Sequence, residues 1–239
     1  MVRLVELLSE ESYAVFVFGQ EKYWKDKENK KIKVCKDLKE CIDASKTIIS
    51  AMPLSKNNIT VNCEYSDEQI GLFKLYEKLS NKNFFAGKIP DFFYKDKTIN
   101  NIDLLKIEEL TILNAIPTAE GAIKIALEEM EETIHESNVL IYGFGRIGKI
   151  LCRRFLDLGA NVYCVARKEA DFAWIREMRC LPLKYNEVEN FVTKTNLLIN
   201  TVPSLVVNKN VLKKLKRECV IIDLASLPRR YWQNRSKEI

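Results

Sequence analysis

Residues 138–148, NVLIYGFGRIG, decide the fold class of this 239-residue chain. The first five residues form a short apolar run that is typical of a buried β-strand. They lead directly into Gly143-Phe144-Gly145-Arg146-Ile147-Gly148, which has the spacing GxGxxG. An amphipathic helical pattern follows and ends at Gly159, and residues 161–166 (NVYCVA) then read as a second strand. A strand, glycine-rich turn, helix and strand within about 30 residues form the context in which this spacing predicts dinucleotide binding.

Each glycine of the motif has its own physical reason. Gly143 allows the tight turn, Gly145 lets the backbone approach a pyrophosphate, and Gly148 permits close packing of the helix on the strand. The start of the helix adds unpaired N–H groups and the positive end of the helix dipole. The alternative is a glycine-rich turn that binds nothing. We predict that the cofactor is bound by Gly143, Phe144, Gly145, Arg146, Ile147 and Gly148.

The end of the second predicted strand bears on the choice of dinucleotide. Domains that bind NAD usually place Asp or Glu here, to accept a hydrogen bond from the ribose 2′-hydroxyl. In this chain Arg167 and Lys168 come first, and the first acid is Glu169. A guanidinium fork and an ammonium group suit a 2′-phosphate. The sequence therefore predicts NADP, with NAD as the second choice and a solvated basic loop as the alternative.

The remainder of the second half continues the alternation of strands and helices. Helices are predicted over 169–179, 187–194 and 208–216, and strands over 180–183, 196–201 and 219–224. Such alternation predicts an α/β fold with a doubly wound, mostly parallel sheet. Ligands of these sheets sit at the carboxyl ends of the strands. We accordingly expect Thr201, Val202 and Pro203 to border the nicotinamide half. Asp223, Ala225 and Ser226 follow the last strand, where Asp223 is as consistent with a loop-capping carboxylate as with a catalytic group.

The first half shows the same alternation without a GxGxxG motif. A helical pattern at Leu4, Leu7 and Leu8 precedes strands predicted over 13–18, 47–51 and 84–87. We expect two Rossmann-like domains: an N-terminal α/β domain for substrate or partner over 1–116, and an NAD(P)-binding domain over 117–239. Because the first domain opens on a helix followed by a strand, its first strand is expected to be missing.

The junction between the halves carries the candidate catalytic residues. Pro117 and Thr118 have the residue types that favour a helix start, and Glu120 would then lie in the first turn. One interpretation is purely structural, with Thr118 as the cap. The other is functional: the helix start and Thr118 hold a substrate carboxylate, and Glu120 handles a proton. We predict Thr118 and Glu120 as the catalytic candidates.

Composition argues against several classes of protein. Hydrophobic residues make up 47% and charged residues 30%, as in ordinary globular proteins. No apolar run approaches the about 20 residues of a membrane helix, and the acids of the first eleven residues argue against export. The 38 basic and 33 acidic residues are mixed, which argues against nucleic acid. Seven cysteines without a CxxC pair indicate reduced thiols in the cytoplasm, and a single histidine, His135, argues against a metal site.

Residues 114–228 resemble the A subunit of dipicolinate synthase. The stretches that carry the resemblance are IPTAEG at 116–121, TIHESNV at 133–139, GFGRIG at 143–148, LGANV at 158–162, AR at 166–167, INTVP at 199–203 and IDLASLP at 222–228. They cover about half of the chain, and the first half is similar with lower specificity. In combination they are specific to this family.

The resemblance implies a function in sporulation. It implies an enzyme in the mother-cell cytoplasm that makes dipicolinate from a dihydro- or hydroxytetrahydro-dipicolinate, a small cyclic dicarboxylate, with NADP as the hydride acceptor. It also implies that the partner is a smaller, flavoprotein-like B subunit. Arg167 matches a position of the family that suits NADP, and a homo-oligomer is left open. The family opens with a further strand and continues beyond Leu227-Pro228, so we expect both ends to be truncated.

Two other functions remain open. A D-2-hydroxyacid dehydrogenase shares this domain plan but needs a catalytic histidine on the late loops, and His135 precedes the nucleotide-domain sheet. A non-catalytic or degenerate protein that binds NADP or assists assembly would carry the same motif. Tight NADPH binding without turnover would favour that second alternative.

Overall fold

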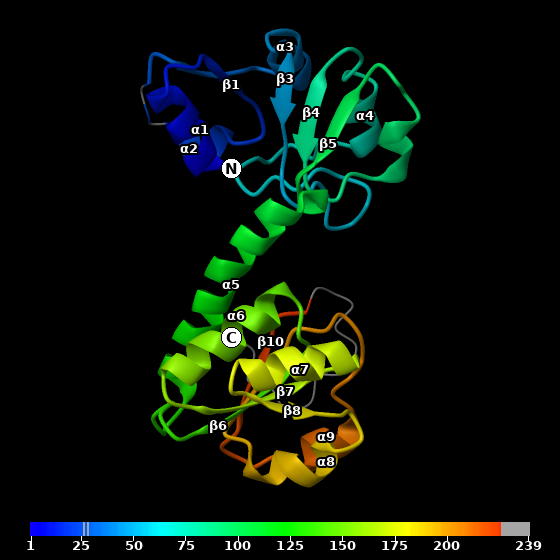
Figure 1. Cartoon of the computed structure of the whole chain (residues 1–239). Helices are drawn as coiled ribbons and strands as arrows, with labels where there is room; N and C mark the ends of the chain where they lie inside the picture. The colour runs from blue at the N-terminus through cyan, green and yellow to red at the C-terminus, as the bar shows by residue number, and fades with distance from the viewer. Residues whose placement is uncertain (26, 28, 226–239) are drawn as a thin grey trace. The chain divides into compact units, whose positions relative to one another are not determined.

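The computed structural model describes residues 1–25, 27 and 29–225 of the chain (Figure 1). It divides into two compact units, and the division falls between Thr111 and Ile112. The sequence predicts the division after residue 116. Both positions lie inside one helix, α5 (Glu108–Glu129), so that no turn marks the boundary.

The C-terminal unit contains one five-stranded parallel sheet with the strand order β10-β9-β6-β7-β8. After α5, its elements are β6 (Asn138–Tyr142), α6 (Arg146–Asp157), β7 (Asn161–Val165), α7 (Glu169–Glu177), β8 (Leu181–Leu183), α8 (Val188–Phe191), η3 (Val192–Lys194), β9 (Leu197–Asn200), α9 (Lys209–Lys214) and β10 (Val220–Asp223). The strands and helices predicted between residues 138 and 224 are all present within a few residues. From β6 the chain first adds β7 and β8 on one side and then crosses back to add β9 and β10 on the other side. This order confirms the doubly wound fold.

Alternate residues of β6 build two separate apolar layers. Val139 and Ile141 pack with side chains of α5, α6 and α7 on one face of the sheet. Leu140 and Tyr142 pack with side chains of α8 and α9 on the other face. All four residues are at most 1% exposed. A strand buried on both faces explains why the run 138–142 is continuously apolar rather than alternating.

The N-terminal unit contains two short parallel sheets. Its elements are α1 (Val2–Glu10), β1 (Val15–Val17), α2 (Glu21–Trp24), β2 (Ile32–Val34), α3 (Leu38–Asp43), β3 (Thr47–Ile49), α4 (Leu72–Tyr76), β4 (Asn83–Ala86), η1 (Asp91–Tyr94), β5 (Asn100–Asp103) and η2 (Leu104–Lys106). One sheet has the order β1-β2 and the other β3-β4-β5. The strands predicted over 13–18, 47–51 and 84–87 are present. The sequence does not reveal β2 and β5, because Lys33, Asn100 and Asn101 interrupt any apolar pattern.

The helix predicted to begin at Pro117 begins nine residues earlier, at Glu108, so that prediction is wrong. Pro117 lies inside α5. Proline at this position removes the N–H that would bond to the carbonyl of Leu113. Leu113 and Pro117 are both exposed, so water can donate a hydrogen bond to the carbonyl of Leu113 in place of the missing N–H. The buried stripe of alanines continues on either side of Pro117 and fixes the helix by packing.

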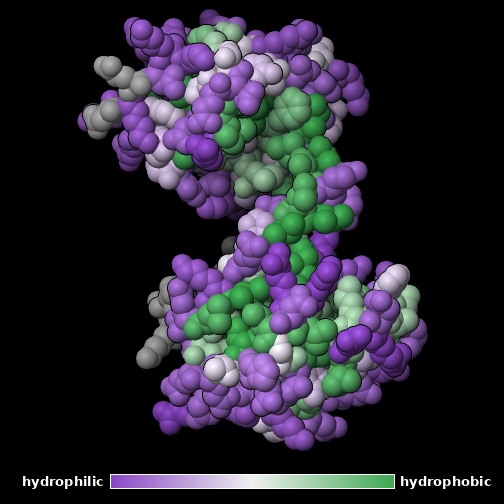
Figure 2. All heavy atoms as spheres, turned by 60° about the vertical axis from the view of Figure 1, so that its left-hand side comes forward, coloured by the Kyte–Doolittle hydropathy of each residue, from purple (hydrophilic) through white to green (hydrophobic). Residues whose placement is uncertain are grey.

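By length and composition alone, α5 is apolar enough to cross a membrane. A mostly buried core helix of a soluble protein passes the same test, but only 22% of the apolar window of α5 is buried, and Ala119, Ala122 and Ala126 lie in the core of the C-terminal unit. Figure 2 shows apolar surface along α5. The apolar residues that it exposes are Leu110, Ile112, Leu113, Ile125 and Leu127. The packing of the alanines accounts for part of its apolar composition without a bilayer.

All seven cysteines are free thiols, as the sequence predicts. Burial raises the pKa of Cys41 from its usual 9.0 to about 12, and it does the same for Cys219. At about pH 8 the thiolate fraction at these sites is then only about one in ten thousand. We expect both thiols to react with Ellman's reagent only after unfolding.

The same pKa shifts carry a prediction for stability. The unfolded chain loses these thiol protons above pH 9.0, whereas the folded chain retains them up to about pH 12. Stability should therefore be fully present below pH 9.0 and should fall as the pH rises towards 12. Urea midpoints measured across this window check the slope. Cys41→Ser and Cys219→Ser variants should each have a flatter profile, and an unchanged slope in both would contradict the assignment.

Candidate functional site: the glycine loop and the strand ends beside it

The turn after β6 requires glycine at its first position. Gly143 has φ +96°, a conformation that side chains rarely adopt. Its N–H donates to the carbonyl of Val165 at 2.9 Å, which ties the turn to β7. A Cβ at Gly143 would lie 2.6 Å from Oγ1 of Thr201. The turn is thus closed on one side by β7 and on the other by the end of β9.

The other two glycines have opposite surroundings. Gly148 is buried in the first turn of α6, and a Cβ there would lie 2.0 Å from the carbonyl oxygen of Gly143. Gly145 is exposed, and a Cβ there would meet nothing within 4 Å. Gly148 therefore sets the approach of helix to turn, whereas Gly145 leaves open space in front of the helix. These are the features that a pyrophosphate needs, so the residues present fit a dinucleotide.

The start of α6 is available to an anion. Gly145 is the N-cap residue, and within the part of the chain that the structure describes no side chain makes a capping hydrogen bond to this helix. The first-turn N–H groups of an α-helix lack intrahelical partners, and the dipole adds positive potential there. Arg146 is exposed beside them, while Ile147 packs partly against the core. The side chain of Phe144 is 7% exposed and belongs to the core, so only its backbone can serve the loop.

The structure places two further residues, one basic and one aromatic, beside the basic pair predicted at the end of β7. Arg167 and Lys168 are both exposed there. Val165 pairs with Leu183 of β8, and the N–H of Ala166 donates to the carbonyl of Leu183. Lys184 and Tyr185 therefore lie beside the end of β7, and we call Arg167, Lys168, Lys184 and Tyr185 together the basic corner. Burial raises the pKa of Tyr185, and the positive charge of Arg167 acts against that rise. Sequence reasoning missed both residues, because nothing local indicates that β8 lies beside β7.

Glu169 contributes a negative charge to this corner. Nζ of Lys184 lies 3.6 Å from Oε1 of Glu169, at the start of α7. Both side chains are more than half exposed, so this ion pair is worth at most about 1 kcal/mol. Glu187 adds a second acid, since its carboxylate accepts from the N–H of Lys184 at 2.7 Å. The three cations Arg167, Lys168 and Lys184 still outnumber the two acids, so the corner keeps a net positive charge. An anionic group would therefore be favoured beside Arg167.

Thr201 and Val202 continue from β9 towards the glycine turn. Oγ1 of Thr201 donates to the carbonyl of Tyr142 at 2.7 Å, so Thr201 fastens the turn as well as closing it. The N–H of Val202 donates to Oδ1 of Asn200 at 3.1 Å. Pro203 is exposed at the same edge of the sheet. The structure thus brings Thr201 and Val202 to Gly143.

Asp223 and Asn200 stabilise the loops behind this edge. Nδ2 of the buried Asn200 donates to Oδ1 of Asp223 at 3.0 Å and to the carbonyl of Val202 at 3.2 Å. The same carboxylate oxygen accepts from the N–H of Ala225 at 3.1 Å. These bonds match the loop-capping interpretation of Asp223. Ser226, which the sequence placed in this group, lies outside the described residues.

Thr118 and Glu120 lie in the middle of α5 rather than at its start. Oγ1 of Thr118 donates to the carbonyl of Asn114 at 3.1 Å, one turn back in the same helix. The carboxylate of the exposed Glu120 lies 3.4 Å from Nη2 of Arg154 in α6. Arg154 is about 12 Å along α6 from Arg146, at 1.5 Å per residue. Neither residue therefore has the free helix start that the sequence predicted for it.

His135 lies at the opposite edge of the sheet from the glycine turn. It is exposed in the loop before β6, and Gly159, which precedes β7, packs against its ring. A Cβ at Gly159 would lie 2.4 Å from Cδ2 of His135. The amino ends of β6 and β7 are therefore beside His135, while the glycine turn follows the carboxyl end of β6. This position matches a structural role.

Two family models match the two parts of the chain. The N-terminal domain of the dipicolinate synthase A subunit matches residues 1–107. The NAD binding domain of D-isomer specific 2-hydroxyacid dehydrogenases matches residues 118–226. The second match indicates a nicotinamide dinucleotide as the cofactor of the C-terminal unit and does not distinguish NADP from NAD.

Curated proteins and solved structures agree with these matches. The dipicolinate synthase A subunit of Bacillus subtilis (strain 168) is 39% identical over 127 residues, which are 53% of this chain and 43% of that protein. The matched stretch thus spans less than half of that relative. The crystal structure of dipicolinate synthase, A chain, from Bacillus subtilis has a TM-score of 0.77 at 28% identity, covering 94% of this chain and 76% of that one.

Two further structures extend the comparison. The dipicolinate synthase A subunit from Bacillus halodurans gives a TM-score of 0.77 at 25% identity, covering 94% of this chain and 78% of that one. A transhydrogenase from Sinorhizobium meliloti shares the fold, with a TM-score of 0.61 at 12% identity over 94% of this chain and 73% of that one. In sequence and in the fold of its two units, the chain resembles the A subunit of dipicolinate synthase.

Proposed function

We propose that this chain is an NADP-dependent oxidoreductase subunit that forms dipicolinate from a dihydro- or hydroxytetrahydro-dipicolinate. The observation that carries the proposal is the glycine turn: Gly143 and Gly148 are packed against backbone and side chains, while Gly145 faces open space at an uncapped helix start. The similarity to the A subunit of dipicolinate synthase supports the substrate class. The oxidoreductase class also fits the match to an NAD binding domain.

Each part of the proposed site has a task. The first-turn N–H groups of α6 hold the pyrophosphate, and Arg167 with Lys168 holds the 2′-phosphate. Thr201, Val202 and Pro203 border the nicotinamide. Bound NADP supplies a hydride acceptor for oxidation of the substrate ring to a pyridine. Thr118 and Glu120 remain our candidates on the substrate side, where Glu120 would take up a proton once its ion pair with Arg154 opens.

The partner and the setting follow from the same similarity. The relatives are named as one of the subunits of their enzyme, which supports a second component. We propose that the partner is a flavoprotein-like B subunit. We further propose that the protein works in the cytoplasm of the mother cell during sporulation. The free thiols fit a reducing compartment.

One alternative function has an observation in its favour. The hydroxyl of Thr118 is bonded within its own helix and the carboxylate of Glu120 is paired with Arg154, which suits a protein that binds NADP without catalysis. A D-2-hydroxyacid dehydrogenase is disfavoured. The one histidine of the chain lies at the edge of the sheet opposite the glycine turn.

A cofactor titration followed by a turnover assay tests the proposal. The purified chain is titrated with NADPH and with NADH, and binding is followed by nucleotide fluorescence and thermal shift. We expect micromolar binding of NADPH and weaker binding of NADH. The B subunit is then added together with the cyclic dicarboxylate and NADP, and formation of NADPH and dipicolinate is measured.

The two steps separate the candidate functions. Turnover that requires all components supports the proposal. Tight binding of NADPH without turnover supports the non-catalytic alternative. A folded chain that binds neither nucleotide would contradict the proposal and would favour a degenerate protein.

A further inference from the structure

The carboxyl ends of β3, β4 and β5 lie at one edge of the larger N-terminal sheet, because the three strands are parallel (Figure 1). The central strand is β4, and Gly87, Lys88 and Ile89 follow its last residue. Open α/β sheets bind their ligands outside the carboxyl ends of the strands. The loop at 87–89 therefore lies at the place in this sheet where a ligand is expected.

The loops on both sides hold Gly87 in place. Its N–H donates to the carbonyl of Ala51 at 3.2 Å, and its carbonyl accepts from the N–H of Leu54 at 2.6 Å. A Cβ at Gly87 would lie 2.4 Å from Cγ of Met52 and 3.1 Å from Cγ of Leu105. The loops that follow β3 and β5 thus meet on Gly87 and fix the start of the loop after β4.

A buried carboxylate fixes the next two residues of the loop. Asp103, the last residue of β5, is 7% exposed. Its Oδ1 accepts from the N–H of Lys88 and from the N–H of Leu105, each at 3.0 Å. Its Oδ2 accepts from the N–H of Ile89 at 3.0 Å. These three backbone groups satisfy the buried charge, so the backbone of Lys88 has a defined position.

Lys88 is an unusual residue for the backbone conformation that it adopts. Its φ is +56°, in the left-handed region that glycine enters without steric cost. Five other described residues that are not glycine have a positive φ, but none of them lies within two residues after the end of a strand. Residues held in such conformations by their surroundings cluster at functional sites. Because a glycine would suit this backbone better, the backbone gives no reason for a lysine here.

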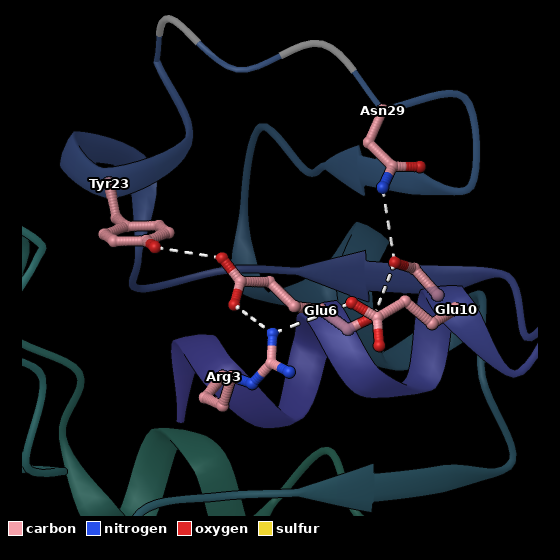
Figure 3. A network of polar contacts seen from close by, with 6 residues as sticks. Arg3, Glu6, Glu10, Tyr23 and Asn29 are labelled. Carbon is pink, nitrogen blue, oxygen red and sulfur yellow. Dashed lines mark hydrogen bonds and ion pairs between the residues drawn. The ribbon is translucent and has the colours of Figure 1, made fainter.

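The arginine of the N-terminal unit is already engaged. Arg3 is the one arginine among residues 1–111, and Nη1 lies 3.1 Å from the carboxylate of Glu6 and 3.6 Å from that of Glu10 (Figure 3). Glu6 also accepts from the hydroxyl of Tyr23 at 3.0 Å. A guanidinium group is the usual partner of a bound carboxylate. Because Arg3 is held by two acids of its own helix, a lysine is the better candidate for that task in this unit.

Three lysines of this unit follow the end of a strand by at most three residues: Lys36 after β2, Lys88 after β4 and Lys106 after β5. The N–H of Lys36 donates to Oε2 of Glu40 at 2.8 Å, which places an acid beside Lys36. Nζ of Lys106 lies 5.0 Å from the centroid of the Tyr94 ring, a cation–π distance. Lys88 is exposed, and its ammonium group forms no ion pair within residues 1–25, 27 and 29–225. Lys88 is thus the lysine of the three that is most available to an anion.

We propose that the ammonium group of Lys88 binds a carboxylate of the substrate, and that Asp103 positions the loop for this purpose. The inference rests on the proposed function, which supplies a small cyclic dicarboxylate as the ligand. An ammonium group offers three donors and a full positive charge, which suit a carboxylate. Thr118 and Glu120, the candidates on the substrate side, provide no cation. Lys88 adds the group that a doubly charged substrate requires.

The test measures how the affinity for dipicolinate depends on the charge of residue 88. The full chain is combined with the B subunit and NADP, and dipicolinate is titrated by calorimetry. Lys88→Gln removes the charge, Lys88→Arg keeps it, and Lys88→Gly removes it while suiting the left-handed backbone. The neutral diamide of dipicolinate is titrated in parallel. Lys97→Gln is the matched control, because Lys97 is exposed three residues before β5, at the opposite edge of the same sheet.

We expect Lys88→Gln and Lys88→Gly to weaken dipicolinate at least about tenfold and to raise the KM of the substrate by a similar factor. Lys88→Arg should retain most of the affinity, and Lys97→Gln should bind like the parent. The affinity for the neutral diamide should hardly change in any variant. Lys88→Gly should melt no lower than the parent, because it removes the ammonium group and relieves the backbone at the same time.

Three results would overturn the inference. Equal affinity of the parent and Lys88→Gln for dipicolinate would show that no carboxylate is bound by Lys88. An equal loss for dipicolinate and for its neutral diamide would show that Lys88 only supports the structure of the loop. A parent that binds NADPH but neither binds nor forms dipicolinate would contradict the proposed function itself, and the role of Lys88 with it.

Discussion

Replacing Gly148 with Ala is expected to destabilise the C-terminal unit severely and to abolish dinucleotide binding. The added methyl carbon would lie 2.0 Å from the carbonyl oxygen of Gly143, which belongs to the backbone of the turn and cannot rotate away. The helix and the turn must therefore separate, which disturbs the packing of Leu151 and Phe155 below them. We expect a loss of at least about 3 kcal/mol of unfolding free energy. Urea unfolding followed by circular dichroism measures it.

Two glycines of the same chain provide matched controls for Gly148→Ala. Gly121 lies exposed in α5 with nothing near its Cβ position, so Gly121→Ala should leave stability unchanged or raise it by up to about 1 kcal/mol. Gly145 also has open space, and Gly145→Ala should fold normally. Gly145→Ala should nevertheless weaken nucleotide binding, because its methyl group occupies the space in front of the helix. A Gly148→Ala protein that melts and binds like the parent would disprove this account of the turn.

Replacing Arg167 with Asp is expected to reverse the preference between NADPH and NADH. Arg167 is exposed at the end of β7, where a 2′-phosphate would accept charge-assisted hydrogen bonds from its guanidinium. The change removes those bonds and adds a repelling carboxylate. An interaction of about 3 kcal/mol corresponds to a factor of about 100 in affinity, so NADPH should bind about 100-fold more weakly. NADH lacks the phosphate and should bind about as well as before, or better through its 2′-hydroxyl.

The same titrations distinguish a local effect from a loss of positive charge. Arg153 is exposed in α6 at about 10 Å from the start of that helix, and Arg153→Asp changes the net charge equally. It should leave the ratio of the two affinities nearly unchanged. Lys184→Gln should weaken NADPH by a smaller factor, since its ammonium group is already shared with Glu169. If Arg167→Asp weakens both nucleotides equally, the 2′-phosphate is not bound there.

The cofactor half of the site was largely predictable from sequence. The apolar run, the glycines and the following helix are contiguous, and each glycine is required by an interaction within its own turn or with the next element. Thr201 was predictable because carboxyl ends of parallel strands share one edge. Lys184 and Tyr185 were not, since their place at Arg167 depends on the order β6-β7-β8 and on the register of Val165 with Leu183. Strand order is a long-range property that no local pattern encodes.

The substrate half shows why local signals fail. Pro117, Thr118 and Glu120 together have the composition of a helix start, yet α5 continues through them, with Ala115 buried before Pro117 and Ala119, Ala122 and Ala126 packed in the core of the C-terminal unit after it. Tertiary packing here outweighs the missing N–H of one proline. Thr118 and Glu120 consequently have partners within α5 and α6 instead of an open helix end.

By itself the sequence determined the α/β class, the glycine turn and most elements of the nucleotide-binding unit, because short-range periodicity and backbone constraints act between neighbouring residues. The tertiary structure decided three other features: the course of α5 through Pro117, the approach of Lys184 and Tyr185 to Arg167, and the division of the N-terminal strands between two sheets. Each depends on which segments lie side by side. Burial and backbone pairing settle that only when the whole unit has folded.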